Sequence, residues 1–115
     1  MEPTKEIIEK ALEAVEVARS SGKLKKGTNE VTKAVENGTA KLVLVAKDVS
    51  PPEIVMHLPL LCKEKNIPFL QVPSREELGA SAGIGVPTTA VAIVHEGEAK
   101  NTVKELAKQL AELAK

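Results

Sequence analysis

The sequence predicts one α/β domain over residues 1–115, a three-layer α/β/α sandwich around a small mixed sheet of four strands. Segments with helical spacing of apolar residues alternate along the chain with short, almost continuously apolar runs, which is the order typical of α/β proteins. A chain of 115 residues suffices for one domain with one core. A composition of 43% hydrophobic and 28% charged residues is that of an ordinary globular protein.

The first part of the chain is predicted to form two helices joined by a short strand. Apolar residues recur at helical spacing over residues 4–20, and Gly22 can end that helix. The basic segment 23–26, between two glycines, supplies the fourth strand of the sheet. A second helix is predicted over residues 29–37, with Thr28 as its N-cap.

Two further strands and a helix are predicted in the middle of the chain. Residues 40–46 are a Val- and Leu-rich run without polar alternation, as in a central strand covered on both faces. A helix then begins at Pro51, and Pro59 should bend it because proline lacks an amide donor. Residues 67–72 form the next strand.

The last part is predicted to hold a short helix, a loop, a strand and a final helix. Ser74 is the expected N-cap of the short helix, and the glycine-rich stretch 79–87 is interpreted as a loop. Residues 89–94 form another buried strand. An apolar stripe predicts the final helix over residues 99–114.

The bulk composition argues against general nucleic-acid binding and against a membrane protein. Sixteen basic and sixteen acidic residues give zero formal charge, whereas nonspecific nucleic-acid affinity comes from excess cations. Trp and Tyr are absent and Phe69 is the only Phe, which excludes aromatic stacking platforms. Cys62 is the only cysteine, and neither a signal peptide nor a membrane-length apolar run is present. We therefore expect a cytoplasmic protein.

No catalytic, metal-binding or cofactor-binding pattern is recognisable. The glycine-rich stretch lacks the ending of a P-loop and the spacing of a dinucleotide-binding turn. His57 and His95 have no partner at metal-ligand spacing. Asp48, at the end of the central strand, is interpreted as a turn and capping residue, with a small α/β enzyme using it as the alternative. We expect neither enzymatic activity nor a cofactor or metal.

The charge is distributed unevenly along the chain. Residues 1–18 carry a net charge of −3, residues 19–33 carry +4, and residues 34–115 carry −1. The cations of the middle segment flank Gly27, where a ligand can approach the backbone, and the predicted helix start favours an anion such as phosphate. A solvated basic loop is the alternative.

Two groups of residues suggest a surface for irregular or unstacked bases. Asn29, Glu30 and Lys33 share one face of the predicted second helix and offer donors and acceptors that complement an irregular base-pair edge. Glu30 can either accept from a base or serve as a first-turn acid. Ile84 and Val86 can either cover an unstacked base or pack into the core.

Three segments resemble the archaeal ribosomal protein L7Ae family, and the resemblance covers nearly the whole chain. They are residues 27–33, 51–68 and 78–87. That family is known for binding kink-turns, RNA duplexes bent sharply at a bulge that is flanked by tandem sheared G·A pairs. The resemblance implies an RNA-binding protein that stabilises bent RNA and has no catalysis of its own.

The resemblance also implies which residues contact the RNA. The G·A edges would be read by Asn29, Glu30 and Lys33, and the adjoining backbone would be contacted by Lys25, Lys26, Gly27 and Thr28. The bulge nucleotides would be covered by Ile84, Gly85 and Val86, with Ile54 and Arg75 near the extruded base. Ser50 and Gly85 stand where relatives carry acids, so the extruded base would be read less strictly.

The hosts that the resemblance implies are the large ribosomal subunit, box C/D and H/ACA guide ribonucleoproteins, and ribonuclease P. The expected partners are the kink-turn RNAs of these particles and the proteins that assemble on guide RNAs, and the free protein is expected to be a monomer. A module of the same fold that binds a different RNA or a protein is the alternative.

Overall fold

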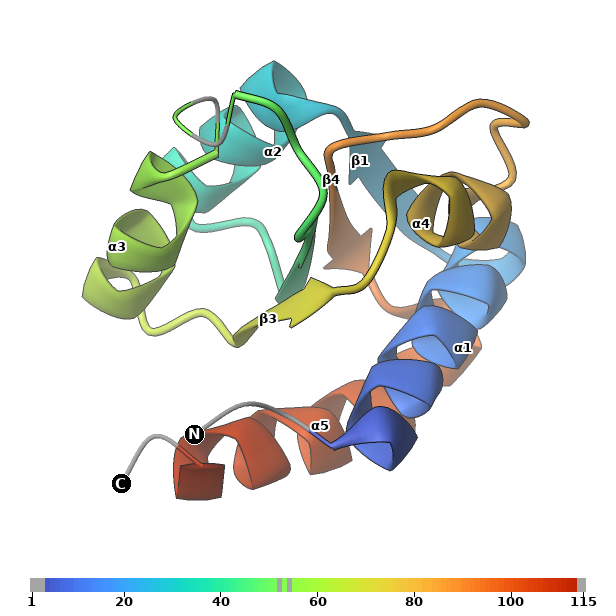
Figure 1. Ribbon diagram of the computed structural model, residues 1–115. Coiled ribbons are helices and arrows are strands. Elements are labelled where there is room, and N and C mark those ends of the chain that lie inside the picture. The colour runs from blue at the N-terminus through green and yellow to red at the C-terminus, as the bar shows by residue number, and fades with distance from the viewer. Residues whose placement is uncertain (1–3, 52, 54, 114–115) are drawn as a thin grey trace.

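A mixed sheet of four strands lies at the centre of the computed structural model, which describes residues 4–51, 53 and 55–113 (Figure 1). The strands are β1 (Lys23–Lys26), β2 (Leu42–Ala46), β3 (Phe69–Val72) and β4 (Ala90–His95). Their order across the sheet is β1-β4-β2-β3. β4 runs antiparallel to both of its neighbours, whereas β2 and β3 are parallel. The predicted strand at 23–26 is thereby confirmed.

Five helices in the described part of the chain flank this sheet. One side carries α1 (Lys5–Ser21), α4 (Arg75–Ala82) and α5 (Lys100–Leu113), and the other side carries α2 (Thr28–Glu36) and α3 (His57–Glu64) (Figure 1). A short 3-10 turn, η2 (Gly97–Ala99), leads from β4 into α5. None of the described helices is long and apolar enough to cross a membrane. The predicted three-layer α/β/α sandwich is confirmed.

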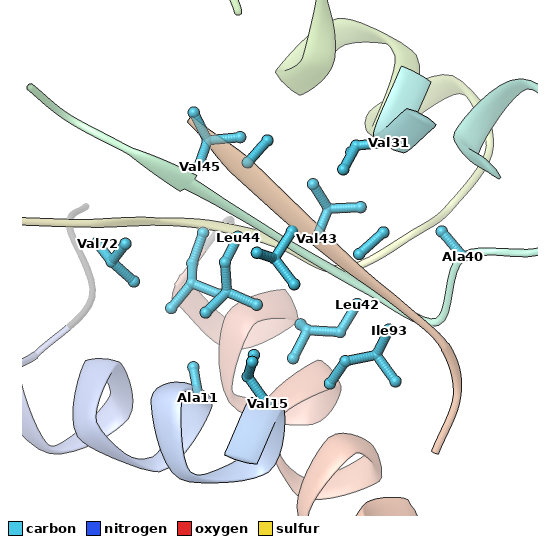
Figure 2. Close-up of a cluster of buried hydrophobic side chains, with 14 of the residues drawn as sticks. Ala11, Val15, Val31, Ala40, Leu42, Val43, Leu44, Val45, Val72 and Ile93 are labelled. Atoms are coloured by element: carbon cyan, nitrogen blue, oxygen red, sulfur yellow. The ribbon is translucent and has the colours of Figure 1, made fainter. Parts of the chain in front are cut away.

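The core is built on the two central strands, β2 and β4. All five residues of β2 are buried, as are the first four of β4. Val31 of α2 packs over one face of the sheet, and Ala11 and Val15 of α1 pack over the other (Figure 2). Because successive residues of a strand point to opposite faces, a strand covered on both sides needs an unbroken apolar run. The unbroken apolar run of β2 is therefore explained, as predicted, by helices that cover both faces of the strand.

The helix after β2 begins later than predicted. α3 starts at His57 rather than at Pro51, which places Pro59 in its first turn. The amides of a first helical turn have no partner within the helix, so the missing donor of Pro59 breaks no hydrogen bond. Pro59 at this position therefore gives no reason for the bend that the sequence predicted in this helix.

The helix before the glycine-rich loop is longer than predicted. Ser74 is its N-cap as expected, because its hydroxyl accepts from the Glu77 amide over 3.1 Å. However, α4 continues to Ala82 and so includes four residues that the sequence assigns to the loop. Gly79 allows this because a Cβ atom at this position would overlap the carbonyl oxygen of Val86. The glycine thus serves close packing between the helix and the loop that follows it.

The single thiol should be unreactive in the folded protein. Cys62 is buried in α3, and burial raises the pKa of its thiol to about 11. Because the thiolate is the reactive species, the disulfide reagent DTNB should label native protein at pH 8 much more slowly than protein unfolded in guanidinium. The absorbance of the released thionitrobenzoate measures both rates, and equal rates would contradict the buried placement.

Candidate functional site

Most of the predicted site residues lie at one edge of the sheet. β1 ends at this edge where β4 begins, because Lys26 pairs with Val91. β2 also ends there, since Val45 pairs with Ala90, and the parallel β3 ends beside it. The edge therefore carries the start of α2, the start of α4 and the loop that precedes β4 (Figure 1).

The start of α2 is attached to β4 by hydrogen bonds of the backbone and of a side chain. The Gly27 amide donates to the carbonyl oxygen of Ala90 over 2.9 Å, and the hydroxyls of Thr28 and Thr89 lie 2.8 Å apart. Gly27 is the N-cap and has a φ of 90°, which side-chain-bearing residues rarely adopt. The expectation that Thr28 caps α2 is wrong, because its hydroxyl is bonded to Thr89 instead.

The first turn of α2 presents amides without partners. No side chain caps this helix, and the N–H groups of Thr28, Asn29 and Glu30 have no acceptor among the described residues. A shallow hollow lies over the turn, lined by Lys26, Gly27, Thr28, Asn29, Glu30 and His57. The free amides, the helix dipole and the ammonium group of Lys26 together favour an anionic ligand such as a phosphate.

A hydrogen-bonded link to α3 supports the same turn. The Thr32 hydroxyl donates to the carbonyl oxygen of Thr28 over 2.7 Å, and Nε2 of His57 lies 2.7 Å from that hydroxyl. Because the single hydroxyl proton is used toward Thr28, Nε2 of His57 must donate to Thr32. His57 thus has a structural role, as the sequence favoured over a catalytic one, but no local signal could have revealed its partner, since the two side chains are 25 residues apart.

Glu30 borders two hollows and forms no ion pair with a described residue. The second hollow is lined by Lys25, Glu30, Lys33, Ala34, Asn37 and Thr39. Glu30 also forms no capping box, because the Gly27 amide from which it would accept is bonded to Ala90. Its exposed carboxylate is therefore available to a ligand, although lysine side chains line both hollows.

Arg75, at the start of α4, is oriented by a residue that follows β2. Oδ1 of Asp48 accepts from the Arg75 amide over 2.9 Å and lies 3.5 Å from the Nε atom of its guanidinium. This contact agrees with the interpretation of Asp48 as a capping residue. The alternative, an enzyme that uses Asp48, does not explain it. No cluster of three or more His, Cys, Asp or Glu side chains in the described ranges could hold a metal ion.

The glycine-rich loop is held against α4 and exposes one apolar side chain. The Ile84 amide donates to the Gly79 carbonyl over 3.2 Å, and the Thr88 amide donates to the Arg75 carbonyl over 3.2 Å. Val86 is 60% exposed, whereas Ile84 is half-buried. Val86 therefore does not pack into the core, which was one of the two alternatives for this loop, and its side chain can contact a ligand.

The structure brings together the basic start of α2, the apolar loop and Arg75 at one edge of the sheet. Gly85 is exposed between Ile84 and Val86. Ile54, the remaining predicted contact, lies outside the described residues. The sequence indicated a capping role for Asp48 but not its partner Arg75, and it did not indicate the contact of His57 with Thr32.

The sequence matches a family model described as the Ribosomal protein L7Ae/L30e/S12e/Gadd45 family over residues 9–103. The chain belongs to this family. A solved structure described as the Giardia lamblia 15.5kD RNA binding protein is 34% identical in sequence to this L7Ae/L30e/S12e/Gadd45-family protein. The match covers 97% of this chain and 93% of that one, with a TM-score of 0.91. The resemblance seen in the sequence is thus confirmed at the level of the family.

Replacing Gly79 by alanine tests whether α4 and the loop are in close contact. Helix propensity alone predicts that Gly79→Ala raises the free energy of unfolding by about 1 kcal/mol. Overlap with the Val86 carbonyl instead predicts a loss of about 2 kcal/mol. Urea unfolding measures the sign, and the exposed Ala80→Ser change on the same helix is the control, with an expected effect of about 0.5 kcal/mol. Stabilisation by Gly79→Ala would show that the loop does not pack there.

Proposed function

We propose that this protein binds kink-turn RNA and stabilises its bend. The observation that carries the proposal is the position of Glu30, an exposed carboxylate without an ion-pair partner among the described residues, beside Lys25, Lys26 and Lys33. An acid at this position repels phosphates unless it accepts hydrogen bonds from a base, so it favours base readout over general attraction. The similarity to a solved structure described as an RNA-binding protein supports RNA as the ligand.

The proposal assigns two tasks to the start of α2. Asn29, Glu30 and Lys33 read the edges of tandem sheared G·A pairs, because together they offer both donors and acceptors. Lys25, Lys26, Gly27 and Thr28 contact the adjoining backbone, where the uncapped amides of the first turn suit a phosphate. Specificity and positioning are thus supplied by neighbouring residues at the end of β1 and in the first half of α2.

The remaining contacts concern the bulge of the RNA. The exposed apolar loop at 84–86 covers the bulge nucleotides, an aliphatic substitute for aromatic stacking. Arg75, oriented by Asp48, lies near the extruded base. Ser50 and Gly85 offer no carboxylate to that base, so we expect its identity to be read less strictly than the G·A pairs.

The mechanism is a shift of the RNA population rather than a chemical reaction. A kink in a duplex costs free energy in the free RNA, and a protein that binds only the kinked form increases the share of that form. Such a stabiliser suits kink-turns of ribosomal RNA, of box C/D and H/ACA guide RNAs and of ribonuclease P RNA. Partner proteins would then assemble on the fixed bend.

A comparison of two RNAs tests the proposed function. One is a bulged duplex with tandem G·A pairs, and the other carries Watson–Crick pairs in their place. We expect tight binding to the first RNA only, with a salt dependence that reflects a handful of phosphate contacts. Equal affinity for both RNAs in a fluorescence titration would contradict base readout.

The variant Glu30→Ala separates base readout from simple repulsion. Loss of a base acceptor should weaken binding to the G·A RNA about tenfold, whereas removal of a merely repelling charge should strengthen binding. Glu36→Ala, an exposed acid of the same helix that lines neither hollow, is the matched control and should change the affinity less than about twofold. Filter binding at fixed salt gives both dissociation constants, and a gain of affinity in Glu30→Ala would refute the assignment.

A further inference from the structure

The negative charge of the first helix plays no part in the proposed RNA contacts. Glu9, Glu13 and Glu16 follow one another along α1, and Glu77 of α4 lines the same shallow groove. α1 and α4 pack against each other in the layer that lies across the sheet from α2 (Figure 1). We call this feature the acidic groove, with its four carboxylates and three further lining residues, Leu12, Ala80 and Ser81.

The four carboxylates of the acidic groove have no cationic partner in the described part of the chain. Lys10 of α1 does not neutralise them, because its ammonium lies 2.6 Å from a carboxylate oxygen of Glu105 in α5. Glu9 and Glu13 are four residues apart, and Glu13 and Glu16 are three apart, which are spacings at which like charges destabilise a helix. A bound cationic group would relieve this repulsion.

A second, independent observation is a hydroxyl without a partner. Ser81 is 7% exposed and lines the acidic groove, yet its side chain forms no hydrogen bond with any described residue. The Ser81 hydroxyl reaches the groove surface and has no partner among the described residues, so it can form a hydrogen bond with a ligand bound there. Leu12, which is half-buried, adds apolar surface against which the methylene stem of a long cationic side chain can lie.

We propose that the acidic groove docks a Lys/Arg-rich segment of a partner protein. Guanidinium and ammonium groups match the carboxylates in charge, and their N–H groups can donate to the Ser81 hydroxyl. Nucleic acid is repelled by the same carboxylates, and no cluster in the described residues could hold a metal ion. The acidic groove contains none of the proposed RNA contacts, although its Glu77 shares α4 with Arg75, so the proposal does not rest on RNA binding.

The test uses the full chain and a fluorescein-labelled peptide of four Arg-Gly repeats. The double variant Glu13→Gln with Glu16→Gln removes two groove charges, and Glu64→Gln with Glu112→Gln removes two exposed charges elsewhere. We expect the groove variant to lose about fivefold in peptide affinity by fluorescence anisotropy, and the control to lose less than twofold. Ser81→Ala, which leaves the net charge unchanged, should lose about threefold.

Three results would overturn the proposal. Equal losses of peptide affinity in the two double variants would assign the binding to net charge. If the wild-type protein bound a peptide of four Glu-Gly repeats as tightly as the Arg-Gly peptide, charge complementarity would not explain the binding. Self-association in sedimentation velocity that disappears with the groove variant would assign the groove to a second copy of this chain. Affinity for the G·A RNA, measured on the same samples, should stay within twofold, so failure of RNA binding and failure of the groove are separate outcomes.

Discussion

The site depends on how the first turn of α2 is attached to β4. In many helices a threonine hydroxyl and a glutamate three residues into the helix satisfy the first amides. Here the Thr28 hydroxyl is bonded to Thr89, and the Gly27 amide is bonded to Ala90. Gly27 holds the N-cap position without a side chain to accept from the first amides, and its own amide is not free for Glu30, so the amides of the turn and the Glu30 carboxylate stay available to a ligand. The same two bonds fix the turn beside the loop that precedes β4.

Zero net charge in this chain is the sum of separated regions of opposite sign. The cations concentrate around the start of α2, whereas the acids of α1 and α4 lie in the layer across the sheet. A protein with little overall positive field attracts arbitrary duplexes weakly and must gain affinity from local complementarity. The proposed recognition of one bent RNA shape is consistent with this distribution, and the acidic groove gives the opposite charge a separate role.

The sequence predicted the architecture well because the central strands are covered on both faces, which leaves an unbroken apolar run in β2. It also placed the basic and polar residues of the site on one helix start, since helical spacing alone brings Asn29 and Lys33 together. The contacts of His57 with Thr32 and of Asp48 with Arg75 were not predictable, because they join residues that only the tertiary fold brings together. The length of α4 was misjudged for a related reason: Gly79 serves packing against Val86 rather than a turn.

The most direct test of the central claim measures the shape of the RNA rather than its affinity. A bulged duplex with tandem G·A pairs carries a donor and an acceptor fluorophore on its two arms, and the energy transfer between them is followed as protein is added. We expect the transfer to rise to a plateau, because the protein binds only the kinked form, and to stay unchanged for the Watson–Crick control. Binding to the G·A duplex without a rise in transfer, or an equal rise for both duplexes, would contradict that expectation.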